Sequence, residues 1–168
     1  MGGNLPYNML KNFYTDEHDV PLDRIIKENC REHKCVLKGN YKDYIILDGD
    51  EIKNNLLQGL KSVDCIIISK KPYDENKIDV ILCELGGDKK WADVKKKMID
   101  SSQHFVEVIN NSDFEIGKFI CCFLGKYQNP KQIKKQKRAN IHINGLNRHN
   151  VKIHNFNCGW EFEKVINL

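Results

Sequence analysis

Three short apolar runs, the last two separated by a helix-like segment, constrain most strongly what this chain can fold into. Residues 63–69 (VDCIIIS), 78–85 (IDVILCEL) and 118–124 (KFICCFL) are each of strand length and rich in β-branched or aromatic side chains. From residue 89 to about 109, apolar side chains recur every three to four positions, which predicts a long helix. Strands interleaved with helices favour an α/β or α+β sheet over a bundle or a sandwich.

Shorter elements flank this central part. The same patterns predict a helix over 21–31, strands at 34–38 and 41–47, and further short segments at 139–143, 151–153 and 160–166. The polar connection between the runs at 63–69 and 78–85 has a length compatible with a hairpin. We expect Gly86-Gly87 to permit the turn from strand into helix.

Length and composition indicate one domain, residues 1–168. The longest apolar run, 119–124, is far shorter than the roughly 20 residues of a membrane-spanning helix, and the N-terminus lacks the pattern of a secretory signal. The seven cysteines are an odd number, which argues for reduced thiols rather than a disulfide framework. We therefore expect a soluble, cytoplasmic protein with no membrane partner.

Two carboxylates interrupt the first two apolar runs. Because side chains alternate along a strand, Asp64 shares a face with Ile66 and Ile68. Glu84 shares a face with Leu82 in the same way. A carboxylate in an apolar strand is costly without compensation. The two acids could share a divalent cation such as Mg²⁺, which prefers carboxylate oxygen; alternatively, each could face water at a strand end or pair with a lysine.

This arrangement resembles the PD-(D/E)XK nuclease superfamily, whose restriction-endonuclease-like core has the element order αβββαβ. In that pattern a lone Asp is followed by (D/E)-x-K on a later strand and by a helix with a Gln. Asp64 matches the lone Asp, Glu84 in CELGG matches the (D/E), and Gln103 in SSQHF matches the helix position. The resemblance covers about residues 22–124 and implies an α/β fold, a central mixed sheet flanked by helices, with 125–168 as a C-terminal extension.

One position departs from the superfamily pattern, because Gly86 stands where the motif has its lysine. Two explanations remain open. Lys89 or Lys90, at the start of the predicted helix, could bring an ammonium group to the site, with Lys97 as a more distant candidate. Alternatively, the domain keeps the fold and binds metal or nucleic acid without cutting. The two acids in apolar strands favour the active interpretation.

The resemblance implies a metal-dependent nuclease that hydrolyses phosphodiester bonds, of DNA rather than RNA, in microbial defence, repair or a mobile element. It implies Mg²⁺ or Mn²⁺ held by Asp64, Glu84 and the backbone carbonyl of Leu85, with Glu28 or Glu32 as an additional acid. The cation would activate water and polarise the phosphodiester, and a lysine would position that water. The catalytic candidates are Asp64, Glu84, Lys89, Lys90 and Gln103.

Basic residues are concentrated after the third apolar run. The formal net charge is only +4, but residues 126–138 (KYQNPKQIKKQKR) contain no acid. Such a basic tract could hold a nucleic-acid backbone through its phosphates, or could be a solvated loop. The candidate nucleic-acid contacts are Lys126, Lys131, Lys134, Lys135, Lys137 and Arg138. We interpret Lys95, Lys96 and Lys97 as a solvent face of the predicted helix.

Zinc is the remaining metal hypothesis. Residues 30–35 (CREHKC) and 149–158 (HNVKIHNFNC) contain zinc-ligand types, but neither has the paired spacing of a known finger. Three functions therefore stay open: a nuclease, an inactive nuclease-like module that binds nucleic acid or a partner protein, and a zinc-stabilised interaction module. The protein could act as a homodimer or with a partner subunit.

Overall fold

The computed structural model describes residues 44–49, 60–69, 77–110, 115–127, 140–146, 150–156 and 162–168. The elements are β1 (Tyr44–Asp48), β2 (Cys65–Ser69), β3 (Lys77–Lys89), α4 (Trp91–Asn110), β4 (Glu115–Tyr127), β5 (Asn140–His142), β6 (Asn150–Phe156) and α6 (Phe162–Ile166). The long helix predicted between the second and third apolar runs is confirmed as α4. The helix predicted over 21–31 and the strand predicted at 34–38 lie outside the described residues.

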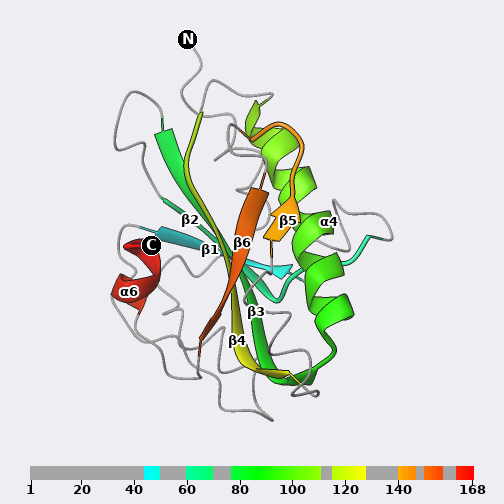
Figure 1. Ribbon diagram of the computed structural model, residues 1–168. Coiled ribbons are helices and arrows are strands. Elements are labelled where there is room, and N and C mark those ends of the chain that lie inside the picture. Colours follow the sequence, from blue (N-terminus) through cyan, green and yellow to red (C-terminus); the bar gives the residue numbers. More distant parts are fainter. Residues whose placement is uncertain are drawn as a thin grey trace.

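The described strands form a mixed sheet in the order β1-β2-β3-β4-β6-β5 (Figure 1). β1, β2 and β3 are successive antiparallel neighbours, which confirms the predicted hairpin. After α4 the chain returns as β4, parallel to β3, as a crossover through a helix allows. β6 then pairs in parallel with β4, so residues beyond 125 extend the same sheet. The fold is therefore α/β with a mixed sheet, as expected.

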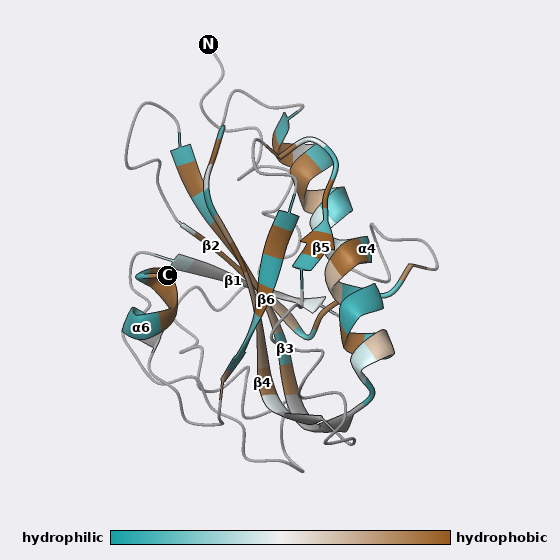
Figure 2. Cartoon of the chain, viewed as in Figure 1, coloured by the Kyte–Doolittle hydropathy of each residue, from teal (hydrophilic) through white to brown (hydrophobic). Residues whose placement is uncertain are grey.

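Within the described residues, α4 and α6 cover opposite faces of the sheet (Figure 1). Alternate strand residues such as Ile66 and Leu82 pack with Met98 of α4 in one buried cluster. The intervening residues face the other way and form a second cluster with Val165 of α6. Figure 2 shows apolar residues concentrated on the crossing strands and on part of α4. No helix in the described ranges is both long and apolar enough to cross a membrane.

Gly86-Gly87 do not form the turn into the helix, which corrects the sequence prediction. β3 continues through both glycines to Lys89, and its pairing with β4 shifts register between Leu85 and Asp88. Such a shift marks an irregularity of the bulge type, where glycine is favourable. The chain turns into α4 only at Lys90, so the glycines serve the end of the strand rather than the helix start.

The cysteines in the described part of the chain are buried free thiols, as their odd number predicted: Cys65, Cys83, Cys121 and Cys122. Cys83 and Cys122 are paired neighbours on β3 and β4, with their Sγ atoms 3.0 Å apart. On the opposite face, burial raises the pKa of the Cys121 thiol to about 12. These thiols therefore behave as small apolar side chains of the two clusters.

Candidate active site

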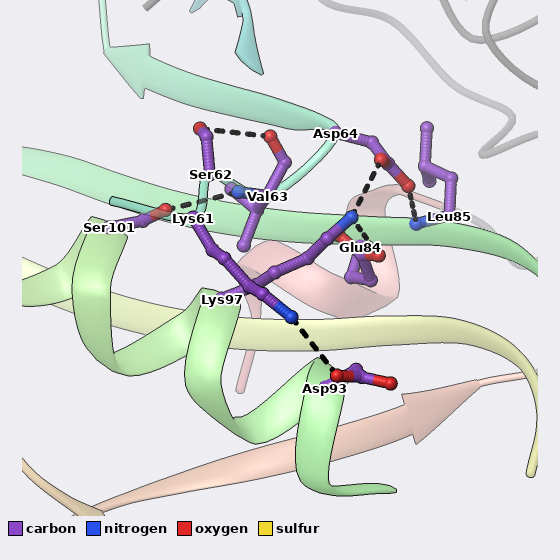
Figure 3. Close-up of polar contacts among 9 residues, drawn as sticks. All are labelled: Lys61, Ser62, Val63, Asp64, Glu84, Leu85, Asp93, Lys97 and Ser101. Atoms are coloured by element: carbon purple, nitrogen blue, oxygen red, sulfur yellow. Dashed lines mark hydrogen bonds and ion pairs between the residues drawn. The ribbon is translucent and has the colours of Figure 1, made fainter. Parts of the chain in front are cut away.

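Asp64 and Glu84 lie at the same end of the β2–β3 hairpin, on the sheet face covered by α4 (Figure 3). β2 begins at Cys65, so Asp64 directly precedes the strand instead of lying within it. Cys65 pairs with Cys83, and continuing this antiparallel register by one residue places Asp64 opposite Glu84. The side chain of Glu84 has 0% exposure, whereas that of Asp64 retains 26%.

A lysine of α4 joins the two carboxylates (Figure 3). Lys97 Nζ lies 2.6 Å from Glu84 Oε1 and 3.5 Å from Asp64 Oδ1. The backbone N–H of Leu85 donates to the other Asp64 oxygen, Oδ2, at 2.7 Å. The buried Glu84 carboxylate thus has the opposite charge that burial requires, and Asp64 is fixed from two sides.

The electrostatics of the cluster keep Lys97 charged. Burial by itself lowers the pKa of the Lys97 ammonium, but the charges of Glu84 and Asp64 outweigh it, and the pKa is raised above its ordinary value. At neutral pH the side chain therefore cannot accept a proton as a general base. It can donate hydrogen bonds and stabilise negative charge.

Hydrogen bonds fasten the segment that carries Asp64 to α4. The backbone N–H of Lys61 donates to Asp100 Oδ2 at 3.0 Å. The N–H of Val63 donates to the hydroxyl of Ser101 at 3.1 Å. Asp100 and Ser101 lie about one helical turn beyond Lys97. One stretch of α4 therefore positions both the lysine and the segment bearing the first acid.

Two further contacts complete this support. The N–H of Gly49 donates to the backbone carbonyl of Asp64 at 3.0 Å, and a Cβ at Gly49 would lie 1.6 Å from the carbonyl oxygen of Val63. Only glycine permits this close approach. Lys61 Nζ forms an ion pair with Asp93 Oδ1 at 3.1 Å, in the first turn of α4. Lys61 also lowers the pKa of Asp93, with smaller effects from the charges of Lys90 and Lys97.

The other predicted catalytic residues are placed differently. Lys90 is exposed, and its backbone carbonyl accepts the first hydrogen bonds of α4. Lys89 ends β3, and the structure does not describe its side chain. Gln103 is exposed, and its position six residues after Lys97 lies about 120° away around the helix. Glu28 lies outside the described residues, as does the alternative acid Glu32.

The predicted nucleic-acid contacts fall mostly outside the described residues. Lys126 is in β4, where its backbone is in register with Asp88 of β3. β3 and β4 are parallel, so their C-terminal ends lie at the same end of the sheet. The basic tract therefore starts at the end of the sheet where β3 terminates. The contacts beyond residue 127 lie outside the described part of the chain: Lys131, Lys134, Lys135, Lys137 and Arg138.

Lys97 is the residue whose position sequence reasoning misjudged. The prediction of a solvent face holds for the exposed Lys96, but it is wrong for Lys97, whose side chain is only 26% exposed. A signal was present in the spacing. Lys97 lies three residues after Val94 and four before Ser101, both buried, so it belongs to the stripe of α4 that faces the sheet.

The donor set at this position fits a hard divalent cation. Within the described ranges, no three His, Cys, Asp or Glu side chains are grouped so as to hold an ion by themselves. Mg²⁺ does not need such a cage, because it commonly binds through one or two carboxylates together with waters and substrate phosphates. Asp64 and Glu84 supply that pair. Of the zinc candidates, His154 lies in β6, whereas residues 30–35, 149 and 158 lie outside the described residues.

The fold and the cluster define an α/β protein with an acid–lysine site at one end of a mixed sheet. No protein-family model matches the chain, and no curated protein or solved structure matches it either.

Proposed function

We propose that this protein is a metal-dependent nuclease of the PD-(D/E)XK type. The observation that carries the proposal is the meeting of Asp64, Glu84 and Lys97, with one ammonium nitrogen 2.6 Å and 3.5 Å from the two carboxylates. The superfamily pattern requires two acids and a lysine. Here Lys97, from α4, takes the place of the motif lysine that Gly86 lacks, and this favours the active interpretation over the inactive one.

The order of elements supports the same proposal. Three antiparallel strands, a helix, and a strand parallel to the third correspond to the βββαβ part of the superfamily core. Both acids lie at the hairpin between the second and third of these strands. The first helix of the core would fall over 21–31, outside the described residues.

The residues of the site have separable roles in phosphodiester hydrolysis. Mg²⁺ or Mn²⁺, when bound, supplies Lewis-acid activation of water and phosphate. Asp64 and Glu84 would hold it, with the carbonyl of Leu85 and the Glu28 carboxylate as additional proposed ligands. Leu85 N–H keeps Asp64 in place through its 2.7 Å hydrogen bond. Lys97 stabilises the negative charge that develops on the phosphate and orients the attacking water.

Nucleic acid is the substrate that the charges favour, and the resemblance to the nuclease superfamily favours DNA over RNA. The basic tract starts at Lys126, which is in register with Asp88 of β3, four residues after Glu84. Its lysines can hold a phosphate backbone beside the two acids without reading sequence. Affinity for nucleic acid should therefore fall steeply as salt is raised.

Cleavage assays with purified protein test the function. Single- and double-stranded DNA and RNA are each incubated with Mg²⁺, Mn²⁺ or EDTA, and the Glu84→Gln variant is run beside the wild type. We expect cleavage that requires the metal and is lost in the variant. Lys95→Met is the matched control, because it changes the charge of the same helix away from the acids; it should cut as the wild type does.

Two outcomes would count against this function. Cleavage that persists in Glu84→Gln would come from a contaminant or another site. Alternatively, the folded protein could bind DNA without cutting it. If this binding is salt-sensitive and weaker in the double variant Lys134→Gln/Lys135→Gln, the result would support the inactive nucleic-acid-binding module.

A further inference from the structure

The Lys97 ammonium lies between the two carboxylates that would have to hold the cation. Its nitrogen is 2.6 Å from Glu84 Oε1 and 3.5 Å from Asp64 Oδ1, on the side from which α4 covers the sheet. We propose that Lys97 is a built-in competitor for this site, whose ammonium must leave the carboxylates before a divalent cation can bridge them. The inference rests on the proposed function and describes how that site is regulated.

Distance and charge both oppose binding of a cation at the two oxygens that Lys97 contacts, Glu84 Oε1 and Asp64 Oδ1. Mg²⁺ requires its oxygen ligands at about 2.0–2.1 Å in near-octahedral geometry. An ion held through Glu84 Oε1 and Asp64 Oδ1 would therefore compete with the ammonium for the same two oxygens. The two cations would also repel each other strongly, because the local dielectric is low where Glu84 is fully buried. The lysine and the metal are therefore alternatives at these two oxygens.

A third carboxylate near the ammonium is that of Asp93, whose Oδ1 also forms an ion pair with Lys61. Asp93 lies four residues before Lys97 on α4, the spacing at which opposite charges meet on one helix face. The charge of Lys97 already contributes to the lowered pKa of Asp93, after the larger effects of Lys61 and Lys90. The Asp93 side chain is 54% exposed, and that of Lys97 is 26% exposed. A turn of the lysine side chain toward Asp93 thus carries the ammonium outward, toward solvent and an incoming phosphate.

This exchange gives Lys97 two positions with different consequences. Against the acids, it compensates the buried charge of Glu84 and keeps the empty site stable. Displaced by a cation, it becomes available to the substrate. The affinity of the wild-type site for divalent metal is lowered by the free energy needed to displace the lysine.

Metal binding without substrate tests the inference. Mn²⁺ affinity is measured by isothermal titration calorimetry on the full chain for the wild type and for Lys97→Met. We expect Lys97→Met to bind at least about tenfold more tightly than the wild type. Lys95→Met is the matched control, because it removes one positive charge from the same helix without vacating the carboxylates. We expect it to stay within about threefold of the wild type.

Each other outcome overturns the inference. Equal affinity in the wild type and Lys97→Met would show that metal binds without displacing the lysine. The same gain in Lys95→Met would reduce the effect to general electrostatics. If neither the wild type nor any variant binds Mn²⁺, there is no metal for Lys97 to compete with and the inference is overturned.

A second measurement on the wild-type protein covers the case in which Lys97→Met does not fold. The ¹³Cε resonance of Lys97 should shift as Mg²⁺ saturates the protein, and an unchanged resonance at saturation would overturn the inference. The proposed nuclease function is tested independently of this inference. If the wild type cuts DNA but the Lys97 resonance does not respond to metal, the function is supported and the inference is overturned. If Lys97→Met binds metal more tightly but the wild type does not cut nucleic acid, the inference is supported and the function is not.

Discussion

At the scale of single residues, the Glu84–Lys97 pair dominates the energetics of the site. Glu84 has no exposed surface, and its nearest opposite charge is 2.6 Å away. Removing one member of a buried pair leaves an uncompensated charge, whereas replacing both costs much less. The pair should therefore show strong coupling in stability as well as in function.

The first prediction concerns that coupling. Lys97→Met should lower the free energy of unfolding by about 1–3 kcal/mol, less than for a fully buried pair because the lysine is partly exposed. Adding Glu84→Gln to this variant should restore part of the loss. Urea unfolding measures both, with Lys95→Met as the control, expected within about 0.5 kcal/mol of the wild type. A double variant whose loss equals the sum of the single losses would show that the two residues are not coupled.

The second prediction is a pH dependence. The pKa of Lys97 is raised in the folded state above its ordinary value of 10.5, so its contribution to stability is complete below pH 10.5. The contribution is lost as the pH rises through the raised pKa. The stability difference between wild type and Lys97→Met, measured by urea unfolding, should be constant from pH 7 to 9 and shrink above pH 10.5. A difference that grows with alkaline pH has the wrong sign for this account.

The third prediction concerns the buried thiols. Burial raises the pKa of the Cys121 thiol to about 12. The pKa of the Cys83 thiol is raised mainly by its hydrogen bond with Cys122 and also by burial. Both should react with iodoacetamide at neutral pH only after unfolding, because the thiolate is the reactive form. Peptide mass spectrometry of native and urea-treated protein reads this out. Rapid native alkylation at either position would show that the sheet faces are open to solvent.

The sequence predicted the face of its own strand on which each acid lies, but it did not predict the position of the lysine. That the two faces coincide follows from the register of β2 and β3, which pairs Cys65 with Cys83 and so places Asp64 opposite Glu84. Lys97 stands in a run of three lysines, and only the helical phase separates it from its neighbours. Once the buried positions of α4 are known, its helical phase shows that Lys97 lies on the side that faces the sheet.

At the scale of elements, α4 holds the pieces of the site together. It contributes Lys97 directly, and Ser101 and Asp100 hold the segment before β2. The helix and the positions of the central strands followed from periodicity, although β4 runs over Glu115–Tyr127 and is longer than the predicted strand at 118–124. The extent of β3 did not, because its residues beyond Gly86-Gly87 are held by pairing with β4, which is distant in sequence.

The fourth prediction tests this anchoring. Ser101→Ala removes the acceptor of the buried Val63 N–H and should lower the free energy of unfolding by about 1–3 kcal/mol. Gln103→Ala, on an exposed side of the same helix, should change it by less than about 0.5 kcal/mol. Thermal or urea unfolding followed by circular dichroism distinguishes them. Equal effects would mean that the hydroxyl does not fasten the segment.

At the scale of the whole molecule, the order of apolar runs predicted the α/β class and the β2–β3 hairpin. It did not predict that β6 would lie beside β4, with β5 at the sheet edge. That placement depends on which strand edges remain open after β1–β4 are assembled, which local periodicity does not encode. The consequence for function is that the site and the start of the basic tract lie toward the same end of the parallel strands.

The rate of metal-dependent DNA cleavage at saturating Mn²⁺, compared among wild type, Glu84→Gln, Lys97→Met and the double variant, tests whether these residues form one nuclease site. Each single variant should lose at least about 100-fold, and the double variant should be scarcely worse than the poorer single one, because residues acting as a unit are non-additive. Single variants that cleave at the wild-type rate would refute the assignment of the site to Glu84 and Lys97.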